Sequence, residues 1–98
     1  MAIQFVGLKN LHEDEIERLN EISARELKKI ERHLNDAKLI FDIKKYDRTG
    51  NRARILINAR LDTPKKKFNM QAEEWDITKV THMIFEKLRN EIIHKEKL

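Results

Sequence analysis

Four basic side chains recur at helical spacing in the first third of the chain. Arg25, Lys28, Lys29 and Arg32 fall within roughly 100° of arc on a helical wheel, on the side opposite an apolar stripe. Cations gathered on one helix face can contact phosphates, because each contact releases counterions condensed on the polyanion. The spacing therefore predicts a phosphate-binding face, although a solvated helix face partly neutralised by Glu21 would show the same pattern.

More cations lie in the last quarter of the chain and in a loop before it. Acidic residues such as Glu86, Glu91 and Glu96 dilute the C-terminal set. If both helices lie side by side, their outer faces would form one basic groove that could take a nucleic-acid strand. Lysines after Pro64 would equally protect a strand edge from aggregation, so the loop has two interpretations. The predicted RNA-binding residues are Arg25, Lys28, Lys29, Arg32, Lys66, Lys79, Lys87, Arg89, Lys95 and Lys97.

The excess of positive charge is regional. The whole chain carries a formal net charge of +4, whereas the segment 25–67 holds 14 bases and 6 acids, a net charge of +8. Such a localised basic surface indicates a polyanionic partner more strongly than the modest overall excess does. A surface laced with ion pairs for thermal robustness would be similarly charged, and is the alternative.

Residues for catalysis or metal binding do not cluster in the sequence. The four histidines, at positions 12, 33, 82 and 94, lack the spacing of metal-binding or hydrolase motifs. There is no cysteine, and two isolated glycines cannot form a glycine-rich phosphate loop. We therefore expect no enzymatic activity, no metal, no cofactor and no small-molecule substrate.

No segment of the sequence resembles a membrane span or an export signal. The longest uninterrupted apolar run is three residues, as at 39–41, and the first eight residues lack a basic start followed by a long apolar stretch. The lack of cysteine fits a reducing compartment. We expect a cytoplasmic protein with no membrane partner.

Two segments follow the helical period. From 11 to 34, apolar residues recur at spacings of three and four, with acids in the first turns and bases toward the end, as the helix dipole favours. A second helix begins after Asp76, whose carboxylate can cap the exposed N–H groups. The expected inward positions are Ile16, Leu19, Ser23, Leu27, Ile30 and Leu34 in the first helix, and Ile77, Val80, Ile84, Leu88 and Ile92 in the second.

Four segments alternate in hydropathy as strands do. A short strand precedes Gly7, two longer strands flank a hairpin turn at 48–51, and a fourth follows Pro64. One side of these strands is apolar and the other polar, so one face of the sheet should be buried and the other wet. The expected inward positions are Leu39, Phe41, Ile43, Ala53, Ile55, Ile57, Ala59, Leu61, Phe68, Met70 and Ala72.

The resulting order, βαβββα, predicts an α+β fold in a single domain, 1–98. A four-stranded mixed sheet with both helices packed on one face, as in a double-stranded-RNA-binding domain, buries every apolar face economically. The wet face carries cations but almost no aromatic side chain that could stack on bases, because Phe41 and Phe68 point inward. Reading of single-stranded bases across the sheet is therefore not expected.

Several stretches resemble the ribosome hibernation promoting factors. The run ELKKIERHL, at 26–34, is similar to the end of the first helix in that family. The segments AEEWD, at 72–76, and FEKLRNEI, at 85–92, resemble its last helix, with a capping aspartate and a Lys-Leu step. Gly7 also stands after the first strand as it does there. The resemblance spans nearly the whole chain and agrees with the βαβββα order, whereas the acidic segment 12–15 departs from it.

This resemblance implies a protein that binds the small ribosomal subunit through rRNA near the decoding region and silences translation under stress. The chain is similar to the short form of the family, without the additional C-terminal domain, and we expect a monomer away from the ribosome. A general structured-RNA-binding domain and a non-catalytic protein-interaction module are the alternatives. By position, the residues that would contact rRNA are Arg25, Lys28, Lys29, Arg32, Lys87, Arg89 and Lys95.

Overall fold

The computed structural model describes residues 2–33, 36–49 and 52–96, and it confirms the predicted order of elements. Leu34, the predicted end of the first helix, and the hairpin tip at 50–51 lie outside the described residues. Short 3₁₀ turns, Leu8–Asn10 and Glu31–His33, flank the first helix. The strands are β1 (Ala2–Val6), β2 (Lys38–Thr49), β3 (Arg52–Asp62) and β4 (Lys67–Glu74), and the helices are α1 (Glu13–Ile30) and α2 (Ile77–Glu96).

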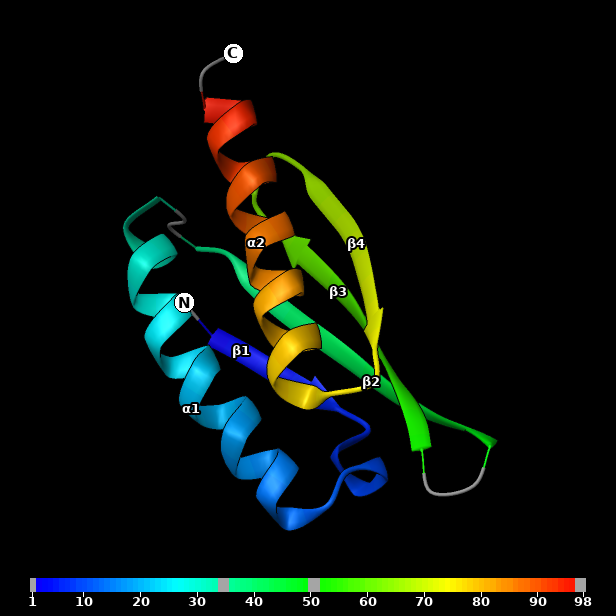
Figure 1. Cartoon of the computed structure of the whole chain (residues 1–98). Helices are drawn as coiled ribbons and strands as arrows, with labels where there is room; N and C mark the ends of the chain where they lie inside the picture. The colour runs from blue at the N-terminus through cyan, green and yellow to red at the C-terminus, as the bar shows by residue number, and fades with distance from the viewer. Residues whose placement is uncertain (1, 34–35, 50–51, 97–98) are drawn as a thin grey trace.

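The four strands form one mixed sheet in the order β1-β2-β3-β4. β1 pairs in parallel with β2, whereas β2 with β3 and β3 with β4 pair in antiparallel fashion. A parallel pair needs a crossover connection, which α1 provides. Both helices cover the same face of the sheet, and the opposite face is left open (Figure 1). The predicted α+β arrangement is therefore confirmed.

The core lies between the sheet and the helices, as the alternation predicts. Phe41 is fully buried at its centre and makes edge-to-face contacts with Phe5 of β1 and Phe85 of α2, at ring-centroid distances of 5.8 and 5.3 Å. Ala53, at the hairpin end of β3, is half-buried. So are Phe68 and Met70, on the edge strand β4. The predicted inward residues that are buried are Leu39, Phe41, Ile43, Ile55, Ile57, Ala59, Leu61, Ala72, Ile77, Val80, Ile84, Leu88 and Ile92.

Helix α1 is rotated relative to the apolar stripe that its sequence predicts. Ile22 and Glu26 are buried, whereas Ile16 and Leu27 are only half-buried. The reason is that α1 packs against α2 as well as against the sheet, so the buried arc extends toward the second helix. The sheet-facing positions Leu19 and Ile30 are buried as predicted, together with Ser23.

Two aspartates control how the chain leaves and enters the helices. After α1, Asp36 adopts a left-handed conformation with φ 59°, which helps to end the helical segment where the sequence predicts a break. Before α2, Asp76 Oδ2 accepts a hydrogen bond from the Lys79 N–H at 3.0 Å, which confirms the predicted cap.

In the described part of the chain, neither helix is long and apolar enough to cross a membrane.

Gly7 joins β1 to the turn that leads into α1, and its backbone requires glycine. Its φ of 92° lies in the left-handed region, and a Cβ at this position would overlap the carbonyl oxygen of Ile43 on β2. The same carbonyl accepts a hydrogen bond from the Asn10 side-chain amide at 3.0 Å. The turn is thus held tightly against β2.

We expect Gly7→Ala to lower the free energy of unfolding by about 1–3 kcal/mol, because it combines backbone strain with a steric clash. Chemical denaturation of the purified variant would measure this change. Lys9→Ala, at an exposed neighbouring position, is the control and should stay within about 0.5 kcal/mol of the parent. A Gly7→Ala protein as stable as the parent would contradict the conformation described.

Ser23 is buried on the inner face of α1, with 2% of its surface exposed. Its hydroxyl oxygen has no hydrogen-bond partner among the described residues. We expect Ser23→Ala to raise the free energy of unfolding by about 1 kcal/mol, since alanine removes an unsatisfied buried hydroxyl and favours the helix. Ala24→Ser, at the exposed next position, should instead lower stability by about 0.5 kcal/mol, so thermal denaturation of the pair separates burial from helix propensity. A loss of stability in Ser23→Ala would contradict this account.

Candidate nucleic-acid interface

The two helices lie side by side and run in the same direction, so their C-terminal ends meet at one end of the molecule (Figure 1). The loop between β3 and β4 lies at this end too, because Asp62 and Lys67 pair with each other and Asp62 pairs with Lys38, at the start of β2 after α1. Helix C-termini carry partial negative charge and favour nearby cations. We call this the helix-end surface, and it comprises Arg25, Lys28, Lys29, Arg32, Lys66 and Arg89.

Charge is distributed unevenly along α1 and the 3₁₀ turn that follows it. Residues 13–21 include five acids and one arginine, whereas residues 25–32 include four cations and two acids. Arg25, Lys28, Lys29 and Arg32 are all exposed, as the helical wheel predicts. One of the two acids, Glu26, is buried, so most of the charge that reaches solvent there is positive.

Glu26 anchors the cations at the junction of the helices. It is 6% exposed, and its Oε2 lies 2.7 Å from Lys29 Nζ, while the Lys29 side chain remains 59% exposed. The hydrogen bond from Lys29 lowers the pKa of the Glu26 carboxyl, with burial opposing this shift and the charges of Lys29, Arg89 and His82 adding to it. Arg89 and His82 therefore lie near Glu26, on the flank of α2 that faces α1.

The cations of α2 do not all face the same way. Arg89 is half-buried near α1, and Lys79 is exposed in the first turn. Lys87 donates a hydrogen bond to the Gln71 carbonyl oxygen at 2.7 Å, which places it on the β4 flank of α2, away from the groove between the helices. The backbone of Lys95 lies in the last turn of α2, but its side chain and all of Lys97 fall outside the described residues.

Lys66 is exposed on a tight loop. The Thr63 N–H and hydroxyl both donate to the Lys66 carbonyl oxygen at 2.8 Å, and the Thr63 hydroxyl accepts from the Lys66 N–H at 2.9 Å. These bonds fix the backbone of Lys66 while its ammonium group stays in solvent. The loop can therefore present a positive charge next to the helix ends.

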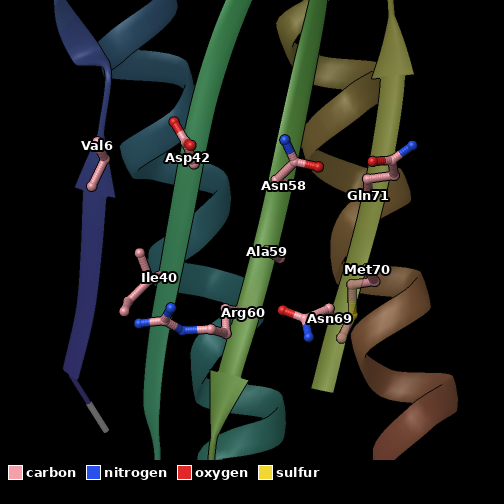
Figure 2. Close-up of a pocket in the computed structure, with 9 residues that line it drawn as sticks. All are labelled: Val6, Ile40, Asp42, Asn58, Ala59, Arg60, Asn69, Met70 and Gln71. Atoms are coloured by element: carbon pink, nitrogen blue, oxygen red, sulfur yellow. The ribbon is translucent and has the colours of Figure 1, made fainter. Parts of the chain in front are cut away.

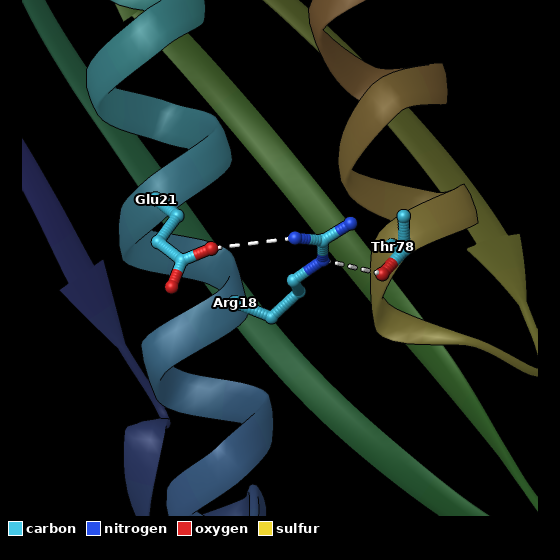
Figure 3. A network of polar contacts seen from close by, with 3 residues as sticks. All are labelled: Arg18, Glu21 and Thr78. Atoms are coloured by element: carbon cyan, nitrogen blue, oxygen red, sulfur yellow. Dashed lines mark hydrogen bonds and ion pairs between the residues drawn. The ribbon is translucent and has the colours of Figure 1, made fainter.

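Polar contacts at the opposite end hold α1 in place. Arg18 of α1 donates to the Thr78 hydroxyl of α2 at 3.1 Å and pairs with Glu21 at 3.3 Å (Figure 3). Glu15 Oε1 accepts from the His12 N–H and from Lys45 Nζ of β2, both at 2.8 Å. Arg18 and Lys45 are therefore engaged within the protein, and the helix-end surface has the less constrained cations.

The open face of the sheet is hollowed between its strands. A depression of about 600 Å³ is lined by residues from all four strands (Figure 2). Val6 and Ile40 supply apolar surface, and Asn58, Asn69 and Gln71 supply amide groups. No group of three or more metal-binding side chains occurs among the described residues. Asp42 and Arg60 also line the hollow, so it offers apolar contact, hydrogen bonding and one charge of each sign.

The sequence alone predicts the four exposed cations of α1 and of the 3₁₀ turn after it, but it does not predict two features that depend on tertiary contacts. In the sequence, Glu26 looks like an ordinary polar helix residue. It lies one helical turn after Ile22, on the same side of the helix, and that spacing is the signal that could have indicated its burial. Trp75 was not assigned to the sheet surface, yet the Arg54 guanidinium of β3 lies over its ring, 5.1 Å from the centroid. The register that brings these residues together is not encoded in local periodicity.

Several solved structures share this fold. The structure of a ribosomal subunit interface protein from Coxiella burnetii matches with a TM-score of 0.70 and 22% identity, covering 100% of both chains. The Protein Y N-terminal domain from Thermus thermophilus matches with a TM-score of 0.55 and 11% identity, covering 93% of this chain and 91% of that one. No family model and no curated protein sequence matches the chain. The structures confirm the fold that the resemblance to hibernation promoting factors implies.

The ion pair between buried Glu26 and exposed Lys29 predicts a defined pH dependence of stability. Because folding lowers the pKa of Glu26, the pair stabilises the protein above the unfolded-state pKa, and this contribution is lost as pH falls through the folded-state pKa. We expect Glu26→Gln to reduce the free energy of unfolding by about 1 kcal/mol at neutral pH and to have little effect in acid. Denaturation at both pH values would test this. Glu31→Gln, at an exposed site, is the control, and an equal loss at both pH values in Glu26→Gln would contradict the role of the charge.

Proposed function

We propose that this protein binds the ribosome and that the helix-end surface contacts rRNA. The observation that carries the proposal is the likeness in fold, over the full length of both chains, to a protein described as a ribosomal subunit interface protein. The exposed cations at the helix ends support it, because they form a surface suited to phosphates on an otherwise mixed-charge molecule.

The finer form of the proposal follows from the resemblance of the sequence to hibernation promoting factors. The protein would occupy the small subunit near the decoding region and silence translation under stress, in the cytoplasm and without catalysis. It would act by occupancy, with phosphate contacts fixing its position and no base-specific chemistry required. Of the predicted RNA-binding residues, Arg25, Lys28, Lys29, Arg32, Lys66 and Arg89 are the central set, with Lys79, Lys87, Lys95 and Lys97 at its margins.

Cosedimentation with purified small ribosomal subunits and with duplex RNA at several salt concentrations tests this proposal. We expect salt-sensitive binding that is selective for the subunit. Arg25→Ala/Lys28→Ala should weaken binding and reduce the slope of log affinity against log salt by up to about two units, since each phosphate contact contributes about 0.9. These two residues are chosen because neither pairs with the buried Glu26, so the fold should be unaffected.

Lys9→Ala is the matched control, because it removes an exposed cation from the turn before α1, at the other end of the molecule. It should leave the slope unchanged. Equal binding to subunits and to any duplex RNA would favour a general structured-RNA-binding domain. Binding to neither would refute both RNA functions and leave a protein-interaction module as the remaining candidate. A translation assay with added protein would then test silencing directly.

A further inference from the structure

We infer that the open face of the sheet carries a second RNA-binding site, which stacks unpaired nucleobases on Tyr46 and on the Arg54–Trp75 pair. This inference goes beyond the proposed function, because it concerns the face of the sheet opposite the helices and a single-stranded ligand. It also reverses the expectation from the sequence that the sheet does not bind single-stranded bases, because the strand register brings together aromatic and arginine side chains that local alternation does not connect. We call these three residues the stacking platform. It lies at the end of the sheet from which α2 begins, away from the helix ends.

The strand register places the three residues in one row across the sheet. Tyr46 of β2 is the cross-strand partner of Arg54 of β3. Ile55 pairs with Glu74, so Trp75 follows in the position beside Arg54. The Arg54 guanidinium carbon lies 5.1 Å from the centroid of the Trp75 ring, and Arg54 Nε lies 3.2 Å from Glu73 Oε1. The guanidinium is thus held between a carboxylate and an aromatic ring.

Exposed aromatic side chains are concentrated at this row. Tyr46 is 41% exposed and Trp75 is 36% exposed, and with Val6 they are the large hydrophobic residues exposed in the described part of the chain. Tyr46 lies on β2 and Trp75 directly after β4, and the two flank the same arginine. Exposure of planar groups in this arrangement costs hydrophobic burial, which a ligand with planar apolar faces would recover.

Unpaired nucleobases are the ligands that fit such a row. Bases of single-stranded RNA stack on tyrosine and tryptophan rings and on arginine guanidinium planes, whereas bases in a duplex are stacked on each other and present only their edges. An acidic protein partner would need uncompensated cations instead, and the charge of Arg54 is already balanced by Glu73. The chemistry of the platform therefore favours a base over an acidic peptide.

The hollow on the same face continues the site along the strands. Asn58 and Gln71 are cross-strand partners, as are Arg60 and Asn69, and all four line the depression. Amide side chains both donate and accept hydrogen bonds, so they can meet any base edge. A single strand that leaves the platform along β3 would reach these groups, since Asn58 lies four residues from Arg54 on the same outward side.

The chain's sole tryptophan makes the platform directly observable. Titration of the intact protein with a short single-stranded oligoadenylate, followed by Trp75 fluorescence, should give saturable quenching. Tyr46→Ala should weaken the apparent affinity about fivefold or more, the loss expected for one stacked base. Because stacking rather than charge carries the interaction, raising the salt should change the affinity much less than it changes binding at the helix-end surface.

Control variants separate this site from the proposed ribosomal surface. Tyr46→Phe keeps the ring and should bind as the parent does. Asn20→Ala, which shortens an exposed residue on α1 in the helix layer on the other face of the sheet, should have no effect. Arg25→Ala/Lys28→Ala should retain the quenching even where it loses ribosome binding. If the protein does not bind ribosomal subunits but its Trp75 fluorescence is still quenched by oligoadenylate, the proposed function is refuted and the stacking platform is still supported.

Three results would overturn the inference. One is the lack of saturable quenching in a folded protein, as judged by circular dichroism. Another is equal quenching by duplex RNA or by an acidic peptide of matched charge, which would mean that the face responds to charge or to protein rather than to bases. The third is an affinity that Tyr46→Ala leaves unchanged while Arg25→Ala/Lys28→Ala abolishes it, which would place the single strand at the helix ends.

Discussion

One-sided burial of the sheet is the constraint on which the rest of this structure depends. Leu39, Phe41 and Ile43 of β2 point to one face, and every strand that pairs with β2 must match that choice, because a register slip by one residue would turn all side chains over. Both helices are then required on the same side to cover the apolar face. The parallel pairing of β1 with β2 and the antiparallel pairing of the rest make α1 and α2 run in the same direction. Their C-terminal ends consequently meet at one end of the molecule.

This parallel arrangement converts a dispersed set of cations into a surface. Arg25, Lys28 and Lys29 lie in the second half of α1, Arg32 lies in the 3₁₀ turn after it, and Arg89 lies in the second half of α2. Placing the helix ends together therefore concentrates positive charge without a long basic run in the sequence. Burial of Glu26 under Lys29 increases this polarity, because a carboxylate is removed from solvent while its cationic partner stays exposed. The acidic first half of α1 is engaged with β2 and α2 through Glu15 and Arg18.

The same constraint leaves the other face of the sheet without a covering layer. The side chains on this face are therefore not constrained by packing in the core, and their polarity can differ from one cross-strand row to the next. A hollow with apolar and polar lining residues occupies the middle rows, and an aromatic and cationic row lies at one end. The two proposals therefore assign different chemistry to the two surfaces: phosphate contact at the helix ends and planar stacking on the sheet. A protein of this size could engage two RNA segments at once, one on each side.

Local periodicity in the sequence determined the order of elements, the inward residues of β2, β3 and α2, the Asp76 cap and the exposure of Arg25, Lys28, Lys29 and Arg32. These properties depend on residues within a few positions of one another, so their spacing is sufficient. Only the tertiary structure decided that Glu26 is buried, that Lys87 turns to β4, and that Tyr46, Arg54 and Trp75 share a row. Each of these depends on helix rotation or strand register between segments far apart in the chain. Both are set by packing of the whole core rather than by any local pattern.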